Sequence, residues 1–174
     1  MYQILHEQPA HAASIEPLLD LCFGPERFLK TAYKVRQELQ PLPELSFVAL
    51  DEGALVGTLR YWPIRIGNPG AKAILLGPIA IHPDRQGEGI GVAMIRQSLA
   101  QARADGHRIV VLVGDPEYYT RFGFTSASER KLELPGPVED RRFLVSELID
   151  GALDGIGGMI AGDPQQDRDQ AAIG

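Results

Sequence analysis

The amino-acid sequence predicts a single α/β (α+β) domain, built on a mixed central sheet of about six to seven strands with helices on both faces. Two apolar runs, residues 74–81 and 109–113, have the length and composition of buried strands. A helical pattern over residues 91–105 separates them and ends at Gly106, where glycine is favoured after a helix. The alternation of strand, helix and strand favours a sheet covered by helices over an all-helical or all-strand fold.

The first part of the chain predicts one strand and two helices. Residues 2–7 form a strand, and residues 12–23 form a helix with apolar side chains on one stripe. Pro25 is well placed to begin a second helix, because proline tolerates the first helical turn. Apolar positions at helical spacing continue that helix over residues 28–39, and the prolines at residues 41–43 end it.

A hairpin follows these helices. Residues 45–50 and 54–63 form its two strands, and Gly53 supplies the residue with positive φ that the connecting turn requires. Asn68, Pro69 and Gly70 indicate a second turn before the next strand.

The chain beyond residue 124 is predicted to close the sheet and then lose regular structure. Residues 131–134 and 142–147 form two closing strands. Residues 150–174 are rich in Gly and Asp and have no sustained hydrophobic period, so we expect a flexible tail. The predicted domain therefore covers residues 1–149, a length that suffices for one hydrophobic core.

A glycine-rich segment joins the apolar run to the helix and is the most informative feature of the sequence. Its residues are Gln86, Gly87, Glu88, Gly89, Ile90 and Gly91. Because glycine has no Cβ, several backbone N–H groups can converge there on an anion at the start of the helix. The spacing fails the dinucleotide fingerprint, and no lysine follows as a P-loop requires. The segment predicts a phosphate site of a different kind.

Two motifs in this order resemble the GNAT superfamily of N-acetyltransferases. The loop matches Gln/Arg-x-x-Gly-x-Gly/Ala through Gln86, Gly89 and Gly91. Downstream, Tyr119 begins a match to Tyr-x-x-x-Gly-Phe, while Tyr118 stands one position too early. The resemblance covers residues 73–124 and is weak elsewhere.

The resemblance implies acetyl-CoA as cosubstrate and a sheet that is splayed between its fourth and fifth strands. It implies that backbone groups of Ile79, Ala80 and Ile81 contact the pantetheine arm or the thioester oxygen. It implies that the glycine-rich loop binds the pyrophosphate. Arg85, beside the loop, is a candidate phosphate ligand, although an exposed, solvated arginine is an equal alternative. Pro78 cannot donate to a strand ladder, so Gly77-Pro78 marks either the bulge of the fourth strand or an ordinary distortion.

The implied chemistry is direct attack of an amine on the thioester in a ternary complex. Tyr119, with a reference pKa near 10, is the candidate general acid for the sulfur, and packing of an aromatic side chain is the alternative. The general base stays open between a water relay and four side chains. These are His82, Asp84, Asp115 and Glu117. The chain also departs from the family pattern, because residues 75–81 contain no acid and residues 114–116 replace a cofactor-binding asparagine.

We therefore predict an acetyl-CoA-dependent N-acetyltransferase acting on a small-molecule or peptide amine. The alternatives are a catalytically silent acyl-CoA-binding sensor or scaffold with the same fold, and a protein that binds another nucleotide. Candidate residues for the acceptor pocket could equally be packing residues. They are Phe28, Tyr33, Arg36, Tyr61 and Trp62.

Composition restricts the partners. The net charge is −6, of which residues 150–174 carry −4, so the remaining chain has no basic field for nucleic acid. A local cluster of Arg85, Arg96 and Arg121 would still suit the phosphates of CoA. No apolar run is long enough to span a membrane, and the four histidines and one cysteine have no metal-ligand spacing. We expect a cytoplasmic, metal-free protein in which Cys22 is a core residue, and a homodimer is compatible with the sequence.

Overall fold

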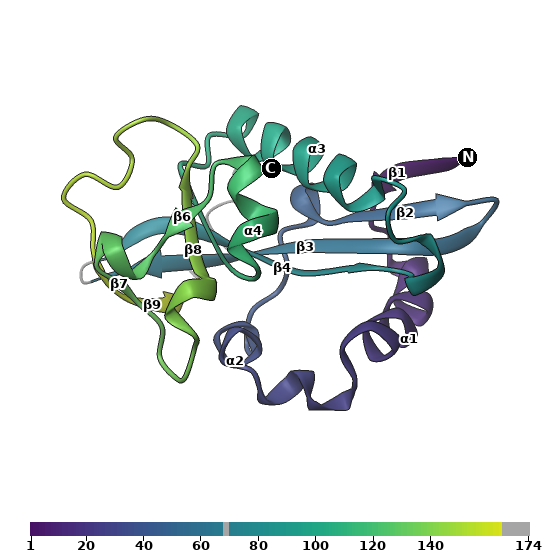
Figure 1. The fold of residues 1–174 in the computed structure, drawn as a ribbon, viewed down its shortest axis with the longest axis horizontal. Helices are drawn as coiled ribbons and strands as arrows, with labels where there is room; N and C mark the ends of the chain where they lie inside the picture. Colours follow the sequence, from purple (N-terminus) through teal and green to yellow (C-terminus); the bar gives the residue numbers. More distant parts are fainter. Residues whose placement is uncertain (68–69, 165–174) are drawn as a thin grey trace.

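The computed structural model describes residues 1–67 and 70–164, which form a mixed sheet with helices on both faces (Figure 1). The strands are β1 (Tyr2–His6), β2 (Phe47–Asp51), β3 (Ala54–Ile66), β4 (Ala71–Ile81), β5 (Ile109–Val113), β6 (Thr125–Ser126), β7 (Leu132–Glu133), β8 (Phe143–Glu147) and β9 (Gly158–Gly162). The α-helices are α1 (Ala12–Phe23), α2 (Thr31–Arg36), α3 (Ile90–Ala104) and α4 (Pro116–Tyr119).

The main path of the sheet runs in the order β1-β2-β3-β4-β5-β8-β6. All neighbouring pairs on this path are antiparallel except β4 and β5, which are parallel and joined through α3. The predicted mixed sheet is confirmed. The described residues form nine strands in all, because β9 pairs with β3 and with the short β7 beside the main path.

The two faces of the sheet bury different helices. Along β2, Phe47 belongs to the core beneath α3, whereas the next residue, Val48, packs with Ile15 of α1. Alternate side chains of a strand point to opposite faces, so one strand supports both helices. Figure 1 shows α3 on one side of the sheet and α1 and α2 on the other. In α3, Ile95 and Leu99 are buried as predicted.

The sheet opens between β4 and β5. The two strands pair only at Ile74–Val110 and Leu75–Val111, and β4 then continues to Ile81 without β5 as a paired neighbour in the described structure. A register shift lies opposite this point, where β3 pairs Leu59 with Ile79 and then Tyr61 with Leu76. The residues left over on β4 are Gly77 and Pro78, and proline cannot complete the ladder. The predicted irregularity and splay are both present.

The second helix differs from the prediction. Residues 25–39 form a 3-10 helix, Pro25–Leu29, followed by the separate α2, because Lys30 between them has an extended backbone with φ −70° and ψ 144°. The buried side chain of the first segment is Arg27, at 2% exposure, and Phe28 is 58% exposed. Arg27 lies there because it forms ion pairs with Glu16 and Asp20 of α1. These partners cannot be read from the helical period.

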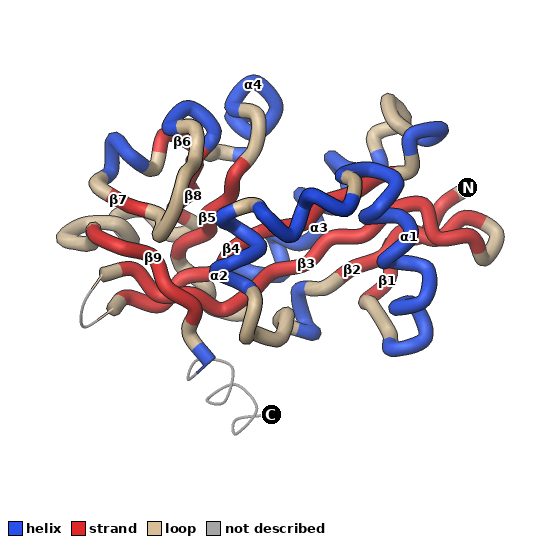
Figure 2. The backbone as a smooth tube through the Cα atoms, turned by 90° about the horizontal axis from the view of Figure 1, so that it is seen from below, coloured by secondary structure: helices blue, strands red, loops and turns tan. Residues whose placement is uncertain are grey.

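The predicted flexible tail is wrong for residues 150–164. Strand β9 pairs with residues 64–66 of β3, and Leu153 and Ile160 are buried, at 4% and 0% exposure. These scattered apolar residues are stabilised only by packing on a sheet edge that distant residues build. Figure 2 shows β6, β7, β8 and β9 gathered at the end of the sheet away from β1. Residues 165–174 of the predicted tail and Asn68-Pro69 of the predicted turn lie outside the described residues.

Candidate active site

A cleft of about 720 Å³ occupies the opening between β4 and β5. One wall consists of Gly77, Pro78 and Ile79 of β4, and another of residues 112–114 at the end of β5. Helix α2 and the pair Tyr118–Tyr119 complete it. The cleft therefore lies where β4 and β5 separate, beside the irregularity at Gly77 and Pro78.

The glycine-rich loop lies at the N-terminus of α3 with its backbone uncovered. Gly87 and Gly89 have φ of 85° and 84°, and no atom lies within 4 Å of where a Cβ would be placed on either. The first turn of the helix is closed by Ala93 N–H donating to Gly89 O at 3.0 Å. Among the described residues, none accepts a hydrogen bond from the N–H groups of Gly87, Gly89 or Gly91. Free N–H groups at a helix start suit an anion such as a pyrophosphate.

Gly91 connects the loop to the cleft. Its missing Cβ leaves room for the Tyr118 hydroxyl, which lies 3.1 Å from the position that a Cβ would take. The Arg121 guanidinium lies 4.7 Å from the centre of the Tyr118 ring. Because the hydroxyl of the same ring adjoins Gly91, this cation also lies near the start of α3. Sequence reasoning passed over Tyr118 because of its place in the motif. The signal in the sequence for this contact is Gly91 itself: glycine just inside a helix, where alanine is more stable, points to another group close to its Cα.

Tyr119 lies on the cleft side of α4. Its ring packs against Gly114, which has no side chain to collide with it, and lies edge-on to Phe124 with 6.0 Å between ring centres. Burial raises the pKa of the phenol above its usual value, and Tyr118 and Asp115 add to the increase. The hydroxyl forms no hydrogen bond within residues 1–67 and 70–164. Tyr119 therefore lines the cleft with a protonated phenol whose hydroxyl has no partner among the described residues.

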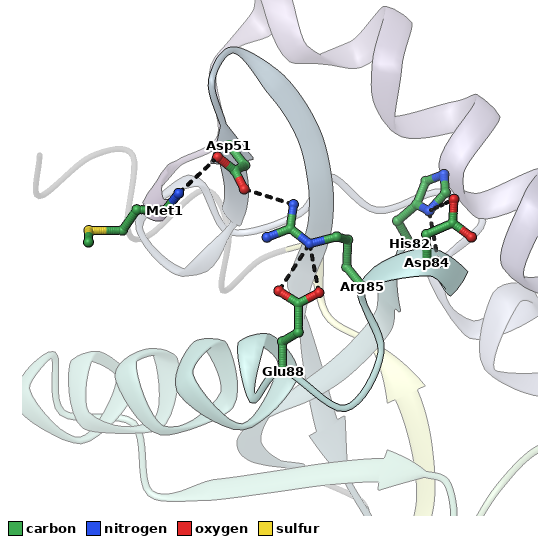
Figure 3. A network of polar contacts seen from close by, with 6 residues as sticks. All are labelled: Met1, Asp51, His82, Asp84, Arg85 and Glu88. Carbon is green, nitrogen blue, oxygen red and sulfur yellow. Dashed lines mark hydrogen bonds and ion pairs between the residues drawn. The ribbon is translucent and has the colours of Figure 1, made fainter.

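Arg85 is engaged by two carboxylates (Figure 3). Its guanidinium lies 2.8 Å from Asp51 and 2.9 Å from Glu88, and Asp51 also binds the N-terminal ammonium group of Met1 at 3.2 Å. Hydrogen bonding to Arg85 lowers the pKa of both carboxyl groups. The sequence left open whether Arg85 is a phosphate ligand. In the structure, Arg85 and Glu88 instead hold the loop to β2 through Asp51.

The three candidate residues of β4 are placed differently. Ile79 lines the cleft, whereas the side chain of Ala80 is buried against α1. The carbonyl oxygen of Ile81 accepts weak hydrogen bonds from Gln86 Nε2 at 3.5 Å and from Cys22 Sγ at 3.4 Å. Burial raises the pKa of the Cys22 thiol, which disfavours the nucleophilic thiolate and agrees with a packing role.

The four candidate bases separate by position. His82 Nδ1 accepts a hydrogen bond from Asp84 N–H at 3.1 Å, so the ring caps the turn before the loop. Asp84 is 88% exposed, and Glu117 is paired with Arg141. Of the four, Asp115 lines the cleft, where it is paired with Arg142 at 3.8 Å.

Comparison with known proteins decides the family. Residues 9–127 match the model of the acetyltransferase (GNAT) domain. The chain belongs to the GNAT acetyltransferase family. The resemblance predicted from the two motifs is confirmed, and so is the prediction of an acetyltransferase. No helix in the described part of the chain has the length and hydropathy of a membrane span.

Relatives of this GNAT protein are similar along most of the chain. The uncharacterized N-acetyltransferase YhbS of Escherichia coli strain K12 is 28% identical over 155 residues, 88% of this chain and 92% of that protein. The crystal structure of YhbS in complex with CoA has a TM-score of 0.81 and covers 96% of this chain and 92% of its own. A Brucella melitensis GNAT acetyltransferase in complex with acetyl-CoA is 30% identical, with a TM-score of 0.62 over 88% and 99% of the two chains.

Proposed function

We propose that the protein is an N-acetyltransferase that transfers an acetyl group from acetyl-CoA to an amine by direct attack in a ternary complex. The observation that carries this proposal is the position of α4. Its Tyr118 hydroxyl adjoins Gly91 of the glycine loop, while Tyr119 faces the cleft. A thioester anchored by its phosphates at the loop would extend past α4 into the opening between β4 and β5.

The loop fits the diphosphate of acetyl-CoA. Its free N–H groups supply donors, and the open space above Gly87 and Gly89 admits phosphate oxygens close to the backbone. Relatives with CoA and acetyl-CoA bound support the same donor for this chain. Because Arg85 is paired with carboxylates, Arg121, which lies over the Tyr118 ring, is the proposed cation for the phosphates.

The side chains of the cleft then have separate tasks. Attack by the amine places negative charge on the thioester oxygen, for which a backbone N–H near Ile79 is the proposed donor. As the carbon–sulfur bond breaks, the Tyr119 hydroxyl donates its proton to the sulfur, and the phenolate regains a proton that the former amine nitrogen releases as the amide forms. The ammonium form of the acceptor loses a proton before attack, to Asp115 or to water at the mouth of the cleft.

The test is release of free CoA thiol from acetyl-CoA in the presence of a panel of amines. Transfer predicts release that depends on the acceptor, together with an acetylated product detected by mass spectrometry. Calorimetry with acetyl-CoA, ATP and NAD should give measurable affinity for the first ligand alone. Binding of acetyl-CoA without release for any amine would favour the alternative, a silent acyl-CoA-binding module. The exposed position of Asp115 and the lack of an acid on β4 keep that alternative under test.

A further inference from the structure

A second cavity of about 560 Å³ lies beside the cleft, between α1, α2 and β3, and three guanidinium groups line it. They belong to Arg27, Arg36 and Arg60, which are 2%, 7% and 16% exposed. Arg36 lines the cleft as well, so it stands where the two cavities meet. A buried guanidinium is costly unless an anion compensates its charge. The partners of the three arginines therefore show which buried positive charge has no compensating anion.

Two of the three charges are compensated within the protein. Arg27 forms ion pairs with Asp20 and with Glu16, the latter at 2.7 Å. Arg60 binds both carboxylate oxygens of Glu7, at 2.8 and 3.0 Å. The positive charges of Arg27 and Arg60 are therefore already neutralised by carboxylates of the protein.

Arg36 has no carboxylate partner within the described part of the chain. Its Nε donates to the Ala32 carbonyl oxygen at 3.1 Å, and its buried Nη1 forms no hydrogen bond with any described residue. The guanidinium carbon lies 4.0 Å from the ring centre of Tyr33 and 5.5 Å from that of Trp62. The aromatic rings cover the guanidinium and leave hydrogen-bond donors unused.

The electrostatic surroundings increase the demand for an anion. The pKa of Arg36 is lowered to about 10, first by burial and then by the positive charge of Arg60, while Tyr33 opposes the decrease. Even so, the group stays charged at neutral pH. A cation held in this way is stabilised when an anion enters the cavity.

We infer that Arg36 binds an anionic group on the amine acceptor, so that the acceptor class is amines that also carry a carboxylate or a phosphate. This inference rests on the proposed transferase function. Arg36 on α2 and Tyr119 on α4 line the same cleft, so one small molecule can present its anion to the first and its amine to the thioester beside the second. Arginine is suited to the task because its planar donors bind two oxygens at once.

The first experiment compares matched amines that differ only in charge, namely β-alanine with β-alaninamide and O-phosphoethanolamine with ethanolamine. We expect kcat/KM of the wild-type protein to be about 10- to 100-fold higher for the anionic member of at least one pair, because a hydrogen bond to a charged group has about that effect. The pair that shows the preference identifies carboxylate or phosphate. Equal values, or a preference for the neutral members, would overturn the inference.

Arg36→Met should abolish the preference by lowering kcat/KM for the anionic amine, and Arg36→Lys should restore only part of it, since an ammonium group lacks the paired donors. Arg108→Met makes the same substitution at an exposed arginine that lines neither cavity, and it should keep the preference. An equal loss for both members of a pair, with unchanged acetyl-CoA affinity and Tm, would contradict the role of Arg36. If Arg36→Met does not fold, Arg36→Lys and the wild-type comparison decide.

A binding measurement separates this inference from the proposed transfer. Trp62 is the sole tryptophan of the chain and lies against Arg36, so its fluorescence reports on ligands at the guanidinium. Titration of the CoA complex with β-alanine or O-phosphoethanolamine should change the emission at concentrations at least tenfold lower than the neutral amines require. That result without thiol release would leave the anion site intact and refute catalysis. Release without a charge preference in either assay would do the reverse.

Discussion

At the scale of single residues, the site depends on which polar groups are already engaged. Arg85 precedes the glycine-rich loop and Glu88 lies within it, yet the two are paired with each other, and Arg85 is also paired with Asp51. Tyr119, in contrast, has a hydroxyl without a partner among the described residues. Availability, more than proximity, therefore separates catalytic candidates from residues that stabilise the loop.

Tyr119→Phe should lower kcat by about 100-fold, because loss of a general acid costs at least that much, while KM for acetyl-CoA stays within about twofold. Tyr118→Phe is the matched control, since its hydroxyl adjoins Gly91. That variant should weaken acetyl-CoA binding more than it lowers kcat. Steady-state kinetics and calorimetry distinguish the two. Turnover near the wild-type value in a folded Tyr119→Phe protein would remove the general-acid role.

The double variant Asp51→Asn, Glu88→Gln should make the stability of the protein less sensitive to acid pH. Both carboxyl groups have a pKa below their ordinary values of 3.8 and 4.5, owing first to Arg85. Groups whose folded pKa is lowered stabilise the protein above the unfolded pKa and lose this contribution as pH falls through the folded value. Tm measured from pH 6 to pH 3 should therefore fall less in the variant. Glu38→Gln, at an exposed carboxylate, should leave the wild-type slope; an equal slope in the double variant would refute this linkage.

At the scale of elements, the turn between β4 and α3 combines two properties of glycine. Positive φ at Gly87 and Gly89 shapes the loop, and the missing side chain at Gly91 admits Tyr118. Tyr118, which also lines the cleft between β4 and β5, links this loop to the cleft. Backbone conformation and sheet geometry together suit the extended cofactor that we propose.

Gly89→Ala should reduce both stability and cofactor binding. The Cβ meets open space, so the cost is the backbone conformation at φ 84°, about 1–2 kcal/mol. Gly53→Ala in the β2–β3 turn, with φ 82° and equally open space, is the matched control. Chemical denaturation should give similar losses for both variants, whereas calorimetry should show weaker acetyl-CoA binding for Gly89→Ala alone. Wild-type affinity in that variant would argue against the loop as the phosphate site.

At the scale of the whole molecule, residues 150–164 complete the fold beyond the predicted boundary. Strand β9 extends from the edge of β3 and joins it to β7, and Ile160 is fully buried. The segment also packs on α2, since Gly162 lies against Leu39 and Val35. The C-terminal strand thus supports the helix that carries Arg36.

Ile160→Ala should destabilise the protein by about 2–5 kcal/mol, the usual cost of a cavity left by a buried isoleucine. Met159→Ala, at a neighbouring side chain that is 46% exposed, should change the free energy of unfolding by less than about 1 kcal/mol. Urea denaturation of both variants gives the comparison. Similar small losses would mean that β9 contributes little to the stability of the domain.

The sequence by itself determined the features that consecutive residues encode. Hydrophobic period defined α1 with its bounds and the strand–helix–strand unit, Gly53 located the hairpin turn, and the spacing of residues 86–91 and Tyr119 identified the family. Each of these follows from local backbone conformation or from a short motif, which needs no knowledge of distant contacts.

Only the tertiary structure decided which groups are paired and which short segments are buried. It paired Arg85 with Asp51, left Arg36 without a carboxylate among the described residues, and packed β9 onto β3. These outcomes depend on residues far apart in the chain, because the free energy of an ion pair or of a short strand comes from the partner that the fold brings to it. The charge and burial of residues that line the cleft are therefore properties of the assembled molecule.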